Sequence, residues 1–127
     1  MMHTLLGGAL LVHGVAHLVG FVVPWRIVTS PEIPYRTTLL GVDIGPAGVR
    51  AVGIAWLLAA ILFVAVAASM LRHAAWPFEA VLTLVGVSVA LCVLGLPESR
   101  PGLLANAAIG ALLVLGWFLG LYPEMQT

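Results

Sequence analysis

Four long stretches that are almost free of charged side chains limit what this chain can fold into. They run from Met1 to Trp25, from Ala51 to Leu71, from Trp76 to Leu96 and from Gly102 to Tyr122, and the third carries only Glu79 in its first turn. A helix rises about 1.5 Å per residue, so about 20 apolar residues cross the hydrocarbon of a bilayer. We therefore predict an all-α fold, an integral membrane four-helix bundle with helices at about residues 2–23, 49–71, 76–96 and 102–122.

The composition supports one transmembrane domain over residues 1–127. The chain is 62% hydrophobic and 8% charged, whereas soluble domains carry roughly a quarter of charged residues. The charges balance and form no basic stripe, so nucleic acid is not expected as a partner. All five basic side chains are arginine, which indicates GC-rich coding and a bacterial source. We expect a protein of the bacterial cytoplasmic membrane, with membrane lipid around it and its first stretch retained as a span because it does not resemble a signal peptide.

The segment between the first two stretches, residues 24–48, is too long for a simple connection. Loops of this length are usually functional or disordered. Eight apolar side chains argue against disorder here: Ile27, Val28, Ile33, Tyr35, Leu39, Leu40, Val42 and Ile44. We expect a structured loop that caps one mouth of the bundle, with a hairpin near residues 35–40. Because the arginines concentrate on the side of this loop, the positive-inside rule predicts that the loop is cytoplasmic.

A histidine pair lies inside the first stretch. His13 and His17 are four residues apart, so on a helix they share one face, about 40° apart around the axis. An ionisable side chain at membrane depth is costly and usually faces protein or a water-filled cavity. We therefore predict that both rings point into the bundle and mark a site.

Several roles fit this pair. Neutral rings could bind neighbouring helices as structural contacts, hydrogen-bond a quinone or another polar-headed lipid, or relay protons near neutral pH. A metal site needs further ligands at motif spacing, which the chain lacks. Axial haem ligands lie on opposite sides of a ring, which two residues of one helix cannot supply. No catalytic and no metal-binding residues are assigned.

Two polar residues belong at the same end of the bundle as His17. Arg50 opens the second stretch and Asn106 lies early in the fourth. We predict a ligand-binding site formed by His13, His17, Arg50 and Asn106. The alternatives are interfacial placement or pairing with Asp43 for Arg50, and an interhelical contact for Asn106. Cys92, the only cysteine, is expected to be buried as a small hydrophobe.

Three features carry a resemblance to a known family: the segment His13-Gly-Val-Ala-His17, the long loop after it, and the turn Gly95-Leu-Pro-Glu-Ser-Arg-Pro-Gly102. In these features the chain resembles the DoxX-like small four-helix membrane proteins, in an uncharacterised actinobacterial branch. That group includes a quinone-linked thiosulfate-oxidising subunit. The resemblance implies a quinone-facing or redox-partner role. It also implies a cytoplasmic N-terminus, which opposes the orientation that the arginines predict.

Three functions follow as hypotheses. The first is an accessory or binding subunit, not an enzyme, with an intramembrane polar pocket for a quinone or lipid-like molecule. The second is a component of a quinone-linked oxidoreductase that uses His13 and His17 for proton transfer. The third is a structural subunit of a larger membrane complex. Other membrane subunits, or further copies of this chain, are candidate partners.

Overall fold

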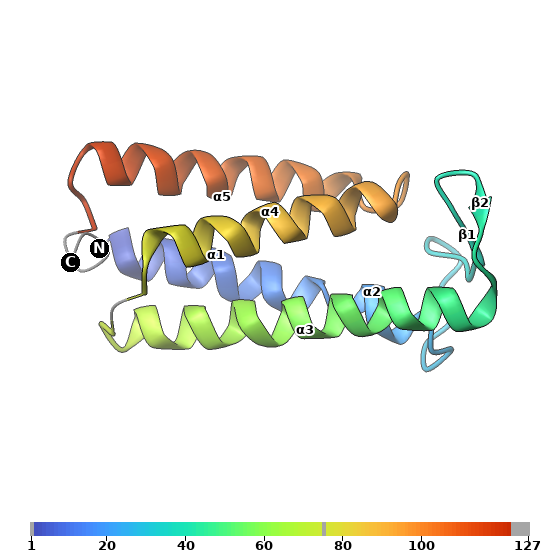
Figure 1. Ribbon diagram of the computed structural model, residues 1–127. Helices are drawn as coiled ribbons and strands as arrows, with labels where there is room; N and C mark the ends of the chain where they lie inside the picture. The colour runs from blue at the N-terminus through green and yellow to red at the C-terminus, as the bar shows by residue number, and fades with distance from the viewer. Residues whose placement is uncertain (1, 75, 123–127) are drawn as a thin grey trace.

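The computed structural model describes residues 2–74 and 76–122, and four long helices lie side by side along its length (Figure 1). They are α1 (Met2–Ala16), α3 (Gly45–Leu71), α4 (Phe78–Leu94) and α5 (Arg100–Phe118). A one-turn helix, α2 (Val19–Val22), continues the direction of α1. The predicted helical bundle is confirmed, and α1 packs mainly along α3 while α4 packs along α5.

Three segments are long and apolar enough to cross a membrane. They are Thr4–Val22, Gly45–Leu71 and Arg100–Phe118. The third stretch, predicted as a span at residues 76–96, corresponds to α4, an apolar helix of 17 residues that is shorter than these three segments. It reaches about 25 Å at 1.5 Å per residue, close to the hydrocarbon thickness of a bilayer.

The first helix is interrupted at the histidine pair. At Ala16 the regular pattern of α1 ends, and the N–H groups of His17 and Leu18 bond to carbonyls three residues earlier, at 3.1 Å each. Such a tightened turn inside a helix often marks a functional position. The continuous helix predicted for residues 2–23 is therefore wrong in this detail, because the backbone tightens at His17 before α2 begins.

The second long helix starts four residues earlier than predicted, at Gly45 instead of residue 49. Pro46 occupies its first turn, where a missing N–H and a fixed φ are compatible with a helix. The Asp43 carboxylate accepts a hydrogen bond from the Gly45 N–H at 3.0 Å. Proline and glycine at residues 45–48 were expected to belong to the loop, but in the structure they form the first turn of the helix.

The last helix ends at Phe118 instead of residue 122. Gly120 adopts a φ of +65°, and the Leu121 N–H bonds to the Gly116 carbonyl at 2.8 Å. This is the Schellman arrangement that ends helices at a left-handed glycine. The chain then turns back, and Tyr122 is buried between the helices.

The fold also contains a small β-hairpin, so it is not all-α as predicted. Strands β1 (Thr38–Leu39) and β2 (Val42–Asp43) pair antiparallel, and their two-residue turn, Leu40-Gly41, has φ values of 50° and 82°. Positive φ at both positions is typical of the type I′ turn that joins hairpin strands. The hairpin lies at one end of the bundle, opposite the N-terminus and the end of α5 (Figure 1).

The loop covers the bundle only in part. Of its eight apolar side chains, Ile33, Tyr35 and Leu39 are half-buried, while the other five are exposed. The loop that was expected to cap the mouth of the bundle therefore packs against it through only part of its apolar side chains.

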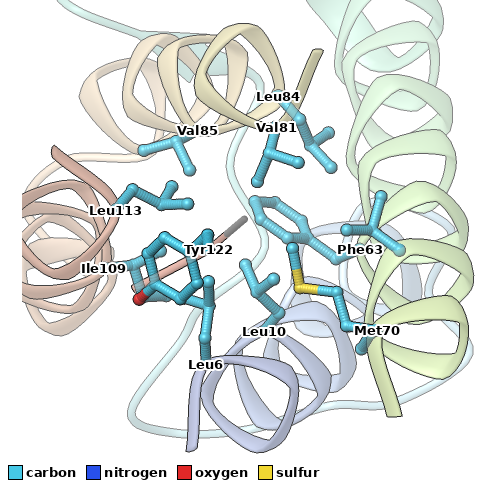
Figure 2. Close-up of a cluster of buried hydrophobic side chains, with 12 residues drawn as sticks. Leu6, Leu10, Phe63, Met70, Val81, Leu84, Val85, Ile109, Leu113 and Tyr122 are labelled. Carbon is cyan, nitrogen blue, oxygen red and sulfur yellow. The ribbon is translucent and has the colours of Figure 1, made fainter. Parts of the chain in front are cut away.

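The apolar core lies in the half of the bundle away from the hairpin. The side chains that meet there come from all four long helices and from the residue Tyr122 (Figure 2). They include Leu6 and Leu10 of α1, Phe63 and Met70 of α3, Val81, Leu84 and Val85 of α4, and Ile109 and Leu113 of α5. Phe63 lies at the inner end of this core, next to the histidine pair. The core thus positions the polar groups in the other half of the bundle.

Candidate functional site

Both histidines of the first helix are buried in the bundle. His13 is 5% exposed and His17 is 2% exposed, which confirms the predicted inward orientation. Their rings meet edge to face with centroids 4.5 Å apart. The ring of Phe63 lies 5.1 Å from each of them, and Trp56 lies 5.0 Å from His17, so aromatic side chains of α3 border the pair.

Ser88 of α4 connects the two rings. Its hydroxyl oxygen lies 3.1 Å from Nε2 of His13 and 2.8 Å from Nε2 of His17. Ser88 is fully buried. Sequence reasoning missed this residue, although it is a hydroxyl near the middle of the third apolar stretch, and a polar group at that depth is a usable signal.

Asn106 of α5 completes the cluster. Its Oδ1 lies 3.1 Å from Nε2 of His13, and its Nδ2 donates to the Gly102 carbonyl at 3.0 Å. The sulfur of Cys92 lies 3.5 Å from the same Nδ2. The predicted proximity of His13, His17 and Asn106 is therefore present in the structure, and the four residues His13, His17, Ser88 and Asn106 are called the polar cluster below.

Arg50 lies apart from the polar cluster. Its side chain is exposed, and its guanidinium lies 5.7 Å from the ring centroid of Trp25. The indole of Trp25 donates to the Arg50 carbonyl at 3.2 Å. The structure does not bring Arg50 to the histidines, because it lies on the outer face of α3, where its charge stays accessible to water.

Two glycines allow the first helix to approach α3 at this level. A Cβ on Gly14 would lie 2.6 Å from Cβ of Phe63, and a Cβ on Gly20 would overlap the ring of Trp56. Close approach at small residues is typical of helix pairs in membranes. These glycines therefore place the histidines directly against the aromatic side chains of α3.

A cavity of about 280 Å³ lies between the polar cluster and the loop. His13, His17 and Cys92 line its inner end, and Val52 and Trp56 of α3 line one wall. Loop residues 33–36 and 38–39 and the turn from Leu94 to Ser99 enclose the outer end. This volume is near the lower end of small-molecule sites, which is the size for a ring or headgroup and not for a whole lipid.

An ion pair joins the two segments that enclose the outer end of the cavity. Nη2 of Arg36 in the loop lies 2.7 Å from Oε1 of Glu98 in the turn before α5. Both residues line the cavity. Arg36 is half-exposed and Glu98 is more buried, so the pair holds the loop to the α4–α5 turn at a position that water reaches.

The cavity combines a polar end with apolar walls. No group of three or more histidine, cysteine or acidic side chains that could hold a metal ion is found among the described residues. No protein-family model, curated protein or solved structure matches this chain. Its function is therefore inferred from the arrangement of the cavity and the polar cluster, and the ligand-binding role of these residues stays a prediction.

Proposed function

We propose that this chain is an integral protein of the bacterial cytoplasmic membrane whose cavity binds a quinone or another lipid-like molecule with a polar head. The supporting observation is the cavity of about 280 Å³ with two histidines at its inner end and apolar or aromatic walls. Ligand sites of this kind combine a mostly apolar lining with a few convergent polar groups. The three long apolar helices and the apolar α4 are compatible with a membrane location.

The ligand would enter with its head toward the histidines. The head would reach His13 and His17, and an apolar ring would lie against Val52 and Trp56, which line the cavity wall. A tail too large for the cavity would leave at its outer end, between the loop and the α4–α5 turn. The bound molecule would thus be held in the bundle while its tail remains in lipid.

We propose a binding or accessory role rather than catalysis. The polar cluster contains hydrogen-bonding groups but no ion pair among the described residues, and each of its four members contacts another member or the backbone. Such a cluster can hold a ligand without transforming it. The DoxX-like resemblance is consistent with a protein that serves a redox partner, and further membrane subunits or copies of this chain would be its partners.

A quinone-linked oxidoreductase component is the second candidate. The chain of hydrogen bonds from His13 through Ser88 to His17 is the observation that favours it, because histidines joined by a hydroxyl can pass protons. At the His17 side, however, this row of hydrogen bonds ends on the His13 carbonyl, and Asn106 leads only to the Gly102 carbonyl. Carbonyls accept hydrogen bonds and do not carry protons onward, so we place binding first.

Native mass spectrometry of the gently solubilised protein tests the proposal, since it reports bound lipid, quinone and further subunits together. We expect one bound molecule of defined mass on the wild-type chain and none on His17→Ala, with the variant still folded by circular dichroism. A purely structural pair gives another result. His17→Ala would then melt at a lower temperature, and neither protein would carry a bound molecule other than detergent and a broad range of bulk lipids.

A further inference from the structure

The hydrogen-bonding roles in the polar cluster are fixed, beginning with His17. Its Nδ1 lies 2.8 Å from the carbonyl oxygen of His13, and a carbonyl only accepts, so Nδ1 carries the hydrogen. No carboxylate of the described residues pairs with this ring, which is 2% exposed. Burying an uncompensated charge is costly, so the ring is neutral and its Nε2 accepts. The Ser88 hydroxyl therefore donates its hydrogen to His17.

The roles of His13 follow from those of its neighbours. Because the Ser88 hydroxyl donates its only hydrogen to His17, its oxygen accepts a hydrogen bond from Nε2 of His13. Asn106 uses Nδ2 on the Gly102 carbonyl, so its Oδ1 faces the same Nε2 and also accepts. Turning the amide over would place two oxygens against each other at Gly102. Both contacts therefore place the hydrogen of His13 on Nε2.

One acceptor is then left over in the histidine pair. Nδ1 of His13 carries a lone pair and has no hydrogen-bond partner among the described residues. His13 is only 5% exposed, and a buried polar atom without a hydrogen-bond partner costs free energy of folding. His13 also lines the cavity, so a ligand in the cavity is the group that can supply the missing hydrogen.

We infer that the inner end of the cavity accepts a hydrogen bond from its ligand, so that the ligand it selects is an aromatic hydroxyl of the phenol or quinol type and not the corresponding ketone or ether. Trp56 and Tyr35 line the cavity together with the histidines, which favours a ligand with an aromatic ring. Rings of this kind prefer offset or edge-to-face contact with an aromatic ligand. This inference rests on the proposed function and narrows it, because the reduced, hydroxyl-bearing quinol and not the quinone is then the form that the cavity binds.

The first test needs no ligand. Nitrogen-15 spectra of the full chain labelled at histidine distinguish the two neutral tautomers and the charged ring. We expect His13 with its hydrogen on Nε2 and His17 with its hydrogen on Nδ1, and both rings neutral at pH 7. A His13 ring with hydrogen on Nδ1, in either the neutral or the charged form, overturns the inference whatever the cavity binds.

The second test compares 1-naphthol with 1-methoxynaphthalene, which share a ring system and differ in the donated hydrogen. Isothermal titration calorimetry of the wild-type chain, with Val52→Trp as the control for uptake by detergent, should give about tenfold tighter binding of the naphthol, as expected for one hydrogen bond. Equal binding of both probes, or tighter binding of the ether, overturns the inference and leaves the proposed function standing. Binding of neither probe above the control overturns both.

Discussion

The Ser88 hydroxyl lies 2.8 Å from Nε2 of His17, although 71 residues separate the two along the chain. The contact joins the first helix to α4 near the middle of the bundle. The same hydroxyl reaches His13, so one small side chain binds one nitrogen of each imidazole in a region without charged partners among the described residues. The pair and its neighbours form the polar end of the cavity.

Removal of this hydroxyl should destabilise the bundle. Ser88→Ala leaves Nε2 of His17 without its donor, and a buried group that loses its partner costs roughly 1–2 kcal/mol. We expect a lower melting temperature in detergent by circular dichroism. Ser69→Ala, near the end of α3 away from the cluster, serves as the matched control and should change little. An unchanged melting temperature for Ser88→Ala would contradict the described cluster.

The close approach of the first helix to α3 gives a second prediction. Gly14→Ala places a methyl group 2.6 Å from Cβ of Phe63, so the helices must separate, at a cost of about 1–3 kcal/mol. Gly8→Ala is the matched control, because nothing lies within 4 Å of its added Cβ and alanine favours a helix over glycine. In thermal unfolding, the melting temperature of Gly14→Ala should therefore lie below that of wild type, and the melting temperature of Gly8→Ala should lie at or above it.

The four helices and the inward orientation of the histidines could be predicted from the sequence, and the contact of Ser88 with the histidines could not. Runs without charges indicate membrane helices because the cost of charge in lipid is large, and that same cost turns His13 and His17 inward. The rotation of α4 about its axis decides whether Ser88 faces the pair, and an almost uniformly apolar helix gives no periodicity from which to read it. Arg50 was placed at the right end of the bundle but on the wrong face for the same reason.

The loop was predicted in outline only. The hairpin predicted near residues 35–40 lies at residues 38–43 instead, because its turn forms at Leu40 and the left-handed Gly41. The contact of Arg36 with Glu98 joins segments that are far apart in the chain, and no local pattern specifies it. The early start of α3 was missed because Pro46 suits both a loop and a first helical turn.

The Arg36–Glu98 ion pair should limit access to the cavity. Cys92 lines the cavity wall and is the only cysteine of the chain, so its reaction with a small methanethiosulfonate reports entry. Glu98→Gln should raise the labelling rate several-fold, because the loop loses its ion pair to the α4–α5 turn. High salt should raise the rate of the wild type in the same direction, whereas the rate of the variant should not respond. Equal rates in both proteins would exclude this role.

The Asp43 carboxylate should make the start of α3 sensitive to acid. Hydrogen bonds from the Gly45 N–H and then from Thr37 lower the pKa of Asp43 below its ordinary value. A folded-state pKa below the unfolded value means that the stabilisation is present above about pH 4 and is lost as pH falls through the folded pKa. Asp43→Ala should therefore melt earlier than wild type at pH 7, and the difference should shrink at pH 3. Asp43→Asn, which keeps an acceptor, should show less pH dependence than wild type.

The cavity can be filled without touching the polar cluster, which tests most directly whether it holds a ligand. Val52 is half-buried and lines the cavity, whereas Ile54, two residues along the same helix, is 44% exposed and does not line it. Native mass spectrometry of Val52→Trp and Ile54→Trp, purified in the same way as wild type, should show the bound molecule on wild type and Ile54→Trp and its loss from Val52→Trp. Equal occupancy of all three proteins, or no bound molecule on any of them, would contradict a ligand site in this cavity.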